Sequence, residues 1–264
     1  MSERKQVYPK HCPICGVDTN YTYFIEDGKS HLQMTWYRCQ CNVLFNSEFK
    51  KDPSIYTEDY LKDMADAKQA KERFEYPLRL YAPLIEESTY GRMMLDVGFG
   101  VPYVIDAMKE RGWLTWGIDN HPYIKGGGNI YNANFMNYDF DMESDSIFFA
   151  TGIKKLKRKF DLIWMSNVLE SFEEPVAALK KAYDLLDPKG LLYISTPDID
   201  FISKTGITSW PHFKGTEYNV LWSQQALCRE LERIGFKIIM SRRNFSSRFM
   251  RWFDLHIIAQ RNYF

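Results

Sequence analysis

Residues 95–104, LDVGFGVPYV, join the end of an apolar run to a glycine-rich loop, and this junction decides the fold. The run RMMLDVG (92–98) has the length and composition of a buried strand, and VIDAMKERG (104–112) follows with helical spacing. Gly98 and Gly100 stand between them, where a nucleotide-binding loop needs residues without a side chain. The order of strand, glycine loop and helix predicts a ligand-binding loop at the carboxyl end of a parallel strand.

The chain beyond this loop keeps alternating between strands and helices. Further strands are expected at 114–119, 128–135, 160–169 and 191–197, helices at 174–190 and 223–236, and two final strands at 237–243 and 255–261. Ser223 is expected to cap the last helix and Gly235 to end it. Such alternation predicts an α/β fold with a doubly wound parallel sheet. Because no helix separates the last two strands, we expect an edge hairpin and an antiparallel final strand.

The glycine loop does not suit a dinucleotide. The fingerprint G-x-G-x-x-G needs a third glycine beside the pyrophosphate, and Tyr103 holds that position here. S-adenosylmethionine has no pyrophosphate, and its methionine half needs the close backbone approach that Gly98 and Gly100 allow. Its ammonium suits the carboxylate of Asp96, and Pro102 is tolerated in a first helical turn, where an N–H would lack a partner anyway. The loop therefore favours S-adenosylmethionine as the cofactor.

From about residue 90 to 264 the chain resembles the Rossmann-fold (class I) S-adenosylmethionine-dependent methyltransferases. The motifs that carry the resemblance are DVGFGVP (96–102), WGID (116–119), KFDLIWMSNVLESFEEP (159–175) and LLDPKGLLYISTPD (185–198). The first is similar to the family pattern [DE]-x-G-x-G-x-[GSA], with proline at its last position. The resemblance implies a seven-stranded methyltransferase sheet, mostly parallel with the last strand antiparallel, and in-line methyl transfer.

The resemblance also implies which residues bind the cofactor. Asp119, at the end of the second strand, would accept hydrogen bonds from both ribose hydroxyls. Asn134 and Phe135 would contact the adenine, although the family often has an acidic residue where Asn134 stands. Asn167 falls at the end of the fourth strand beside the reaction centre, and Ser171 replaces the usual histidine. The implied cofactor set is Asp96, Gly98, Phe99, Gly100, Asp119, Asn134, Phe135, Asn167 and Tyr60.

The methyl acceptor is expected to meet the long segment 198–223, because long loops in compact domains are often functional. His212 is the candidate general base, with Asn167 and Tyr218 as further catalytic candidates. The alternative is a loop histidine that only hydrogen-bonds locally. Tyr56 and Tyr60 can cap the cofactor, because aromatic faces favour a sulfonium cation. Their alternative role is simple helix packing.

Four of the five cysteines lie within the first 41 residues, as C-x-x-C and C-x-C pairs. The cytosol disfavours disulfides, so such a cluster indicates a metal site. Alternating residues between the pairs predict a hairpin, and the whole resembles a zinc ribbon. The predicted ligands of a structural zinc are Cys12, Cys15, Cys39 and Cys41. Two alternatives stay open: His11 or His31 replaces a cysteine, or the four thiols are free.

The 264 residues carry 34 basic and 34 acidic side chains, so no global field steers the chain to nucleic acid or membrane. The first residues lack the apolar core of a signal peptide, and no 18-residue apolar stretch exists. A cytoplasmic protein without a membrane partner is therefore expected. The predicted domains are a zinc-ribbon-like subdomain (1–50), a helical connector and cofactor lid (51–90) interrupted by Pro77 and Pro83, and a methyltransferase domain (91–264).

Three functions compete on this sequence. The first is methylation of a small molecule or a sugar or glycan. The second is methylation of RNA or protein, with the zinc ribbon as the macromolecule-binding module; a nucleic-acid partner is compatible with zero net charge but not favoured. The third is a binding module that has lost activity, against which the intact Asp96, Gly98, Gly100 and Asp119 argue. The first is preferred, and the sequence assigns neither the attacking atom nor an oligomeric state.

Overall fold

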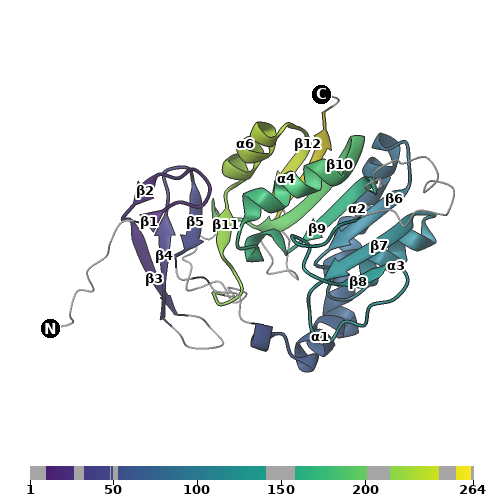
Figure 1. Cartoon of the computed structure of the whole chain (residues 1–264), viewed down its shortest axis with the longest axis horizontal. Coiled ribbons are helices and arrows are strands. Elements are labelled where there is room, and N and C mark those ends of the chain that lie inside the picture. Colours follow the sequence, from purple (N-terminus) through teal and green to yellow (C-terminus); the bar gives the residue numbers. More distant parts are fainter. Residues whose placement is uncertain are drawn as a thin grey trace, which may run out of the picture.

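A seven-stranded sheet forms the body of the protein in this computed structural model, which describes residues 10–26, 33–47, 49, 53–140, 158–200, 215–243 and 254–262. The strand order is β12-β13-β10-β9-β6-β7-β8 (Figure 1). The strands are β6 (Met93–Val97), β7 (Leu114–Asp119), β8 (Ile130–Asn132), β9 (Phe160–Ser166), β10 (Leu186–Pro197), β12 (Phe236–Arg243) and β13 (Asp254–Arg261). The central strands are parallel, and β13 lies antiparallel between β10 and β12. The predicted fold class is confirmed.

Helices cover both faces of this sheet. One face packs on α4 (Pro175–Leu185) and α6 (Gln224–Ile234), and the other on α2 (Ala67–Ser88) and α3 (Tyr103–Glu110). Successive residues of β9 alternate between the two cores, as Ile163 joins the first and Trp164 the second. This alternation follows from the two-residue period of a strand. The carboxyl ends of β6, β7 and β9 are thereby held firmly at one edge.

The capping residues of α6 were predicted correctly. The Ser223 hydroxyl accepts a hydrogen bond from the Ala226 N–H at 3.1 Å, and Gly235 adopts the left-handed conformation that ends the helix. The end of α4 was predicted too late. The helix ends at Leu185, and Gly190 lies inside β10, where the pairing with β9 shifts register. Leu186 already has an extended backbone and is fully buried in β10, so the helix has ended before the glycine is reached.

The expectation that Pro77 and Pro83 interrupt the connector is wrong. After η1 (Pro53–Ile55) and α1 (Glu58–Ala65), α2 continues through both prolines. A proline inside a helix removes one backbone hydrogen bond and costs roughly 3 kcal/mol. The buried face of α2 offsets that cost. Among the helix residues whose burial is described, the buried ones are Phe74, Pro77, Leu78, Tyr81, Ala82 and Ile85.

The N-terminal region forms a second, smaller sheet beside the body (Figure 1). Its predicted hairpin is present as β3 (Thr22–Glu26) and β4 (Gln33–Arg38), and β5 (Val43–Asn46) pairs with β4. The first cysteine turn is closed by the short pair β1 (Lys10–His11) and β2 (Asp18–Thr19), and the second lies between β4 and β5. The sheet takes its last strand, β11 (Val220–Trp222), from the far end of the chain. Because β11 lies between β10 and α6 along the chain, its pairing with β5 ties the small sheet to the body.

Among the described residues, no helix is long and apolar enough to cross a membrane.

Candidate cofactor site and cysteine centre

The loop after β6 has the backbone shape that its glycines predict. Gly98 and Gly100 both have a left-handed φ, +68° and +57°. A Cβ on Gly98 would lie 2.4 Å from a methyl carbon of Val168, and one on Gly100 would lie 2.7 Å from Met64 Cε. Pro102 caps the N-terminus of α3 with no side-chain hydrogen bond. Glycine is therefore favoured by conformation at both positions, and at Gly98 also by the space that Val168 leaves.

Asp119, the last residue of β7, holds this loop in place. Its Oδ2 accepts a hydrogen bond from the Gly100 N–H at 2.9 Å, and its Oδ1 accepts one from the His121 N–H at 2.8 Å. The carboxylate is half-buried at the edge of a pocket. Its position at the carboxyl end of the strand next to β6 is where ligands bind in open α/β sheets.

Two pockets meet at this edge of the sheet. The larger encloses about 240 Å³ and the smaller about 50 Å³, and both are lined by Gly98 and Ser171. The larger pocket contains Asp119, Asn134 and Phe135 among its lining residues. The smaller is lined by Tyr60, Met64, Phe74, Asp96, Gly98, Phe99, Val104, Trp164, Ser166, Asn167, Ser171, Glu217 and Tyr218. The two pockets adjoin at these shared lining residues, and together we name them the bent site.

Most of the candidate residues are gathered in this bent site. Gly100 contributes through its hydrogen bond to Asp119 rather than as a lining residue. The Asn134 side chain accepts a hydrogen bond from the Met136 N–H at 2.8 Å and so shapes the floor of the larger pocket. Asn167 has a left-handed φ of 50°, which turns the chain sharply at the end of β9. His212 lies outside the described residues.

Asp96 is a buried carboxyl group in the smaller pocket. Only 3% of its surface is exposed. Burial, and secondarily the charge of Asp119, raises its pKa well above the ordinary value. A cation that approaches a buried carboxyl group stabilises its ionised form, so the approach is favourable. The carboxyl group is therefore prepared for a positively charged part of a ligand.

Aromatic side chains from the connector close over the same edge. The Tyr60 ring is roughly parallel to His121, with centroids 5.9 Å apart, and Tyr56 contacts both rings edge-on. The Tyr60 hydroxyl donates a hydrogen bond to Glu217 Oε2 at 3.0 Å. Burial and the nearby Glu217 carboxylate raise the pKa of the Tyr56 hydroxyl. Tyr56 and Tyr60 were predicted to lie near the cofactor, whereas His121 was not singled out because no motif marks it.

The segment before β11 is anchored to the loop after β9 through Asn219. Its side-chain amide donates to the carbonyl oxygens of Phe172 and Glu173 at 2.9 and 3.0 Å, and its own N–H donates to the Glu170 carbonyl at 2.7 Å. Glu170 is fully buried and accepts a hydrogen bond from the Thr196 hydroxyl at 2.9 Å. Neither Glu170 nor Asn219 was singled out from the sequence, because their roles depend on contacts between distant segments.

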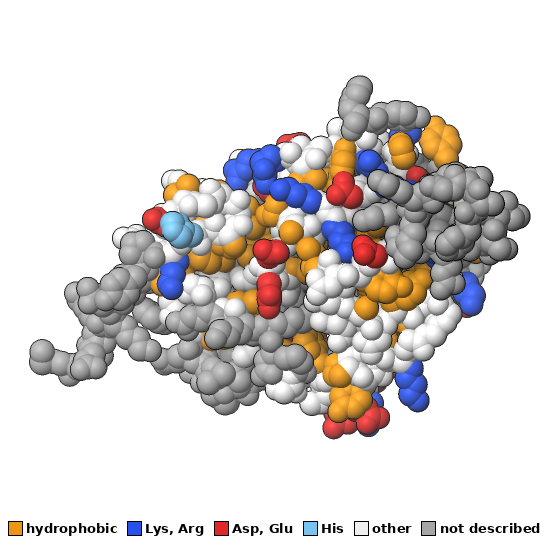
Figure 2. Space-filling model, viewed as in Figure 1, with side chains coloured by type: hydrophobic (Ala, Val, Ile, Leu, Met, Phe, Trp, Pro, Cys, Tyr) orange, Lys and Arg blue, Asp and Glu red, His pale blue; other side chains and the backbone are white. Residues whose placement is uncertain are grey.

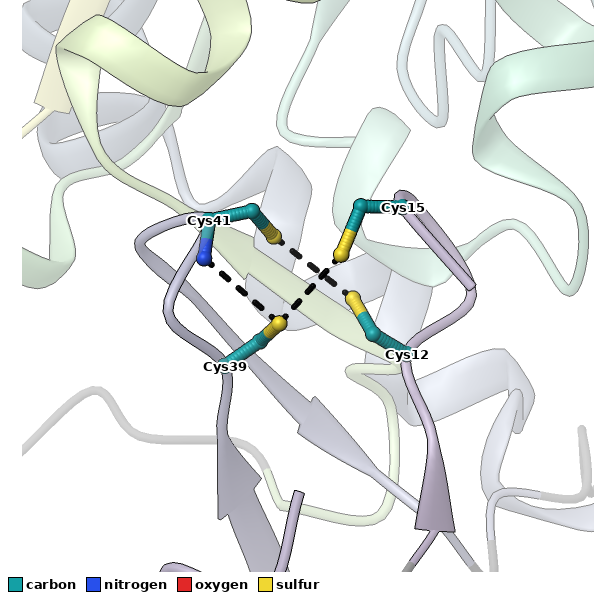
Figure 3. Close-up of side chains that lie close together, drawn as sticks. All are labelled: Cys12, Cys15, Cys39 and Cys41. Atoms are coloured by element: carbon teal, nitrogen blue, oxygen red, sulfur yellow. Dashed lines mark hydrogen bonds between the residues drawn. The ribbon is translucent and has the colours of Figure 1, made fainter. Parts of the chain in front are cut away.

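The four N-terminal cysteines converge on one point (Figure 3). Their sulfur atoms all lie within 4.8 Å of one another and could hold a metal ion. The closest pairs, Cys12 with Cys41 and Cys15 with Cys39, are separated by 3.6 and 3.4 Å. Four thiolates around zinc at about 2.3 Å would lie about 3.8 Å apart in a regular tetrahedron. The spacing is close to that value and too long for disulfides.

The two cysteine turns have matching backbones. The Ile14 and Cys41 N–H groups point at the sulfur atoms of Cys12 and Cys39, both at 3.5 Å. Gly16 follows the first pair with φ +71°, and Asn42 follows the second with φ +69°. Asparagine tolerates this left-handed conformation better than most residues. Asn42 therefore compensates for the shorter C-x-C spacing, and its place directly after that pair was a usable sequence signal.

The thiols are electrostatically linked to one another. A hydrogen bond with Cys41 lowers the pKa of Cys12 to about 5, while burial raises the pKa of Cys39 to about 11. His11 is not drawn into the cluster, because its Nδ1 lies 2.6 Å from the carboxylate of Asp18 at the surface. The other candidate histidine, His31, lies outside the described residues. The described ligand set is therefore four cysteines.

Comparison with known proteins agrees with this geometry. A family model described as a methyltransferase domain matches residues 69–241. The chain belongs to the methyltransferase-domain family. The match includes β6, the glycine loop, Asp119 and α6, and it ends within β12. The cysteine region lies outside the match.

Curated relatives of this methyltransferase domain act on different substrates. The tRNA U34 carboxymethyltransferase of Idiomarina loihiensis is 28% identical over 177 residues, which cover 63% of this chain and 52% of the relative. The ubiquinone biosynthesis O-methyltransferase of Actinobacillus pleuropneumoniae is 28% identical over 123 residues, covering 46% and 52%. The chain spans about half the length of the curated relatives it matches.

Solved structures with the same fold are S-adenosylmethionine-dependent methyltransferases. The 1,6-didemethyltoxoflavin-N1-methyltransferase of Burkholderia thailandensis, with bound S-adenosylhomocysteine, covers 92% of this chain and 99% of its own (TM-score 0.50, 12% identity). Magnesium protoporphyrin IX methyltransferase of Synechocystis PCC 6803, with bound S-adenosylmethionine, covers 82% and 100% (TM-score 0.51, 14% identity). At such low identity the likeness establishes the fold alone.

Proposed function

We propose that this protein transfers a methyl group from S-adenosylmethionine to a small molecule or to a sugar or glycan. The observation that carries the proposal is the bent site, whose two pockets share Gly98 and Ser171. Its acidic groups, Asp96 in the smaller pocket and Asp119 in the larger, match the ammonium and the ribose hydroxyls of the cofactor. A flat ligand such as adenine fits beside Phe135 and Asn134.

The residues act mainly by binding and positioning. The bound cofactor supplies the electrophilic methyl group and its leaving group. Asp119 orients the ribose while keeping the glycine loop in shape, and Asp96 neutralises the ammonium. Tyr60 and Tyr56 cover the site, exclude water and offer aromatic faces to the sulfonium. Asn167 and Tyr218 lie beside the smaller pocket and orient the acceptor. Correct placement of this kind can supply several kcal/mol of the barrier reduction.

The described part of one face of the protein supports a small acceptor rather than a nucleic acid. Acidic and basic side chains are interspersed over the described part of the face in Figure 2, without a field of one sign. Nucleic-acid binding usually needs a basic patch or stripe. The alternative is an RNA or protein acceptor bound through the cysteine region, and similarity to a tRNA-modifying enzyme supports it.

The cysteine centre is proposed to hold a structural zinc ion. Four thiolates form a closed donor set, which leaves no position for a substrate or water on the metal. The Arg229 guanidinium on α6 donates to the Cys41 carbonyl oxygen at 2.8 Å, so the centre also ties the small sheet to the body. Zinc would therefore stabilise the fold rather than take part in the reaction.

The acceptor class can be tested with cofactor carrying a labelled methyl group. The intact protein is incubated with this cofactor and a cell extract separated into small molecules, glycans, RNA and protein. We expect label in the small-molecule or glycan fraction, and none with the Asp119→Ala variant. Label in RNA or protein instead would favour the alternative, and the absence of Asp119-dependent label in every fraction would contradict the proposed activity.

A further inference from the structure

Trp164, on β9, brings a hydrogen-bond donor into the wall of the smaller pocket. Its side chain is 1% exposed and lines this pocket. Among the described residues, the indole Nε1–H has no hydrogen-bond partner. A buried donor without an acceptor is costly, so native structures rarely keep one that nothing satisfies. A ligand in the smaller pocket can supply the missing acceptor.

The Trp164 indole is held in place from the side of β10. The Tyr193 ring stacks on it, with ring centroids 3.8 Å apart and an angle of 27° between the planes. The Tyr193 hydroxyl lies 2.8 Å from Nδ1 of His256 on β13, and this contact fixes the tyrosine in turn. All three side chains are buried. A ring supported in this way can direct its N–H with the precision that ligand recognition requires.

Trp164 lies beside Asp96 in the large sheet. The two residues are register partners in the parallel pairing of β6 with β9, and both line the smaller pocket. Partners on neighbouring strands, about 4.8 Å apart, point to the same face of a sheet. The pocket therefore presents a carboxyl group and an N–H donor next to each other. A ligand that carries an ammonium and a carboxylate on one carbon can meet both.

An anionic group in the smaller pocket meets neutral donors. The lining residues that the structure describes include no lysine, arginine or histidine. Trp164 supplies an N–H, and Ser166, two residues further along the same face of β9, supplies a hydroxyl. The Trp164 N–H is the more deeply buried of the two. It therefore gains most from a carboxylate oxygen, because a hydrogen bond to a charged acceptor is stronger than one to a neutral acceptor.

On the basis of the proposed function, we propose that Trp164 is a specificity-determining residue that binds the carboxylate of the cofactor's methionine end. The indole Nε1–H donates a hydrogen bond to a carboxylate oxygen, while Asp96 receives the ammonium on the same carbon. The two side chains together recognise the complete amino acid group. They discriminate against a cofactor that lacks the carboxylate, such as decarboxylated S-adenosylmethionine.

Two ligands that differ only in the carboxylate test this role. S-adenosylhomocysteine has the complete amino acid group. Its decarboxylated form, S-adenosyl-3-thiopropylamine, keeps the ammonium but has no carboxylate. The ratio of their dissociation constants, measured by calorimetry, therefore reports on recognition of the carboxylate alone.

We expect Trp164→Phe to weaken S-adenosylhomocysteine about tenfold, because a hydrogen bond to a charged group is lost, and to leave the decarboxylated ligand within about twofold. The matched control is Trp116→Phe. Trp116 also has a buried indole N–H without a partner among the described residues, but it packs in the core on the other face of the sheet and lines neither pocket. Its substitution should leave the ratio unchanged.

Nuclear magnetic resonance of the parent protein gives a second test that does not depend on how Trp164→Phe folds. With isotope-labelled tryptophan, the Trp164 indole signal is identified by its contacts with the stacked Tyr193 ring. We expect this N–H signal to move downfield when S-adenosylhomocysteine binds, because the donor gains an acceptor. It should move much less with the decarboxylated ligand.

Three results would overturn the proposal. The first is an unchanged ratio in Trp164→Phe, and the second is an equal loss of both ligands in that variant, which would assign Trp164 to packing alone. The third is an indole signal that responds equally to both ligands. If the parent protein binds neither ligand, the proposed function itself fails, so the two failures are distinguishable.

Discussion

The two sheets of this protein are built in different ways. The seven-stranded sheet is assembled largely from neighbouring strand–helix–strand units, in which β6, β7 and β8 succeed one another along the chain and lie side by side. The four-stranded sheet begins with a local hairpin but is completed by β11, which the chain supplies only after most of the large sheet. The large sheet carries the cofactor site, and the small sheet carries the cysteine centre.

The difference has a mechanical consequence. Because β11 follows directly after Glu217, Tyr218 and Asn219, the edge of the small sheet also fixes one wall of the smaller pocket. Arg229 adds a second connection, from α6 to the Cys41 carbonyl. Substitutions that disrupt the cysteine centre should therefore alter the smaller pocket. Substitutions in the glycine loop should affect only the cofactor site.

The largest effect is expected from Cys39→Ser. Losing a thiolate should release the metal, and loss of a metal is among the few changes that cost more than about 4 kcal/mol. For a domain of this size that corresponds to a fall in Tm of roughly 8–16 °C. Cys228→Ser is the matched control, because Cys228 lies on α6 away from the cluster and donates only to Ser241.

Metal analysis and thermal unfolding of both variants measure this effect. Full zinc occupancy in Cys39→Ser, or an equal loss of Tm in Cys228→Ser, would contradict the assignment of the metal centre.

The second comparison uses two glycines with nearly the same φ, one in each sheet region. Gly98→Ala forces an alanine into the left-handed region and into contact with Val168, for a combined cost of about 2–5 kcal/mol. Gly16→Ala has φ +71° but nothing within 4 Å of the added carbon, so only about 1–2 kcal/mol is expected. Urea unfolding measures the loss in the free energy of unfolding for each variant. S-adenosylhomocysteine binding should vanish in Gly98→Ala and persist in Gly16→Ala; the reverse pattern would refute the placement of the site.

A third prediction concerns pH and Asp96. Because burial raises the folded-state pKa of Asp96 above its ordinary 3.8, its contribution to the stability of the ligand-free protein is fully present below about pH 4 and is lost as the pH rises through the folded pKa. Asp96→Asn removes this titration. The variant should gain stability relative to the parent between pH 4 and 8, yet bind S-adenosylmethionine more weakly. Unfolding curves at several pH values measure the difference in stability between Asp96→Asn and the parent, with exposed Asp106→Asn as the control. A difference that does not grow with pH would be evidence against a buried Asp96 with a raised pKa.

The smallest effect is expected at the junction of α6 with the cysteine centre. Arg229→Ala removes one hydrogen bond to the Cys41 carbonyl and should cost about 1 kcal/mol. Lys237→Ala, an exposed change on β12, should cost less. Equal thermal stability of the two variants would show that the Arg229 contact does not tie the two regions together.

The sequence predicted the large sheet well because its signals are local. The run ending at Val97, the glycine loop and the cap at Ser223 each depend on residues next to one another. The same holds for the cysteine pairs and the hairpin between them. Other features depend on contacts between distant segments, and no local pattern predicts them. They are the pairing of β11 with β5, the anchoring by Asn219 and the burial of Glu170. The continuation of α2 through Pro77 and Pro83 was missed for the same reason, because tertiary burial overrides propensity.

The most direct test of the account is calorimetric titration of the intact protein with S-adenosylhomocysteine. We expect one bound molecule per chain for the parent and for the exposed control Asp106→Ala. We expect Asp119→Ala, with its folding checked by circular dichroism, to bind at least about 100-fold more weakly, because two hydrogen bonds to a charged group are lost. A parent protein that does not bind, or an Asp119→Ala variant that binds equally well, would contradict the proposed cofactor site.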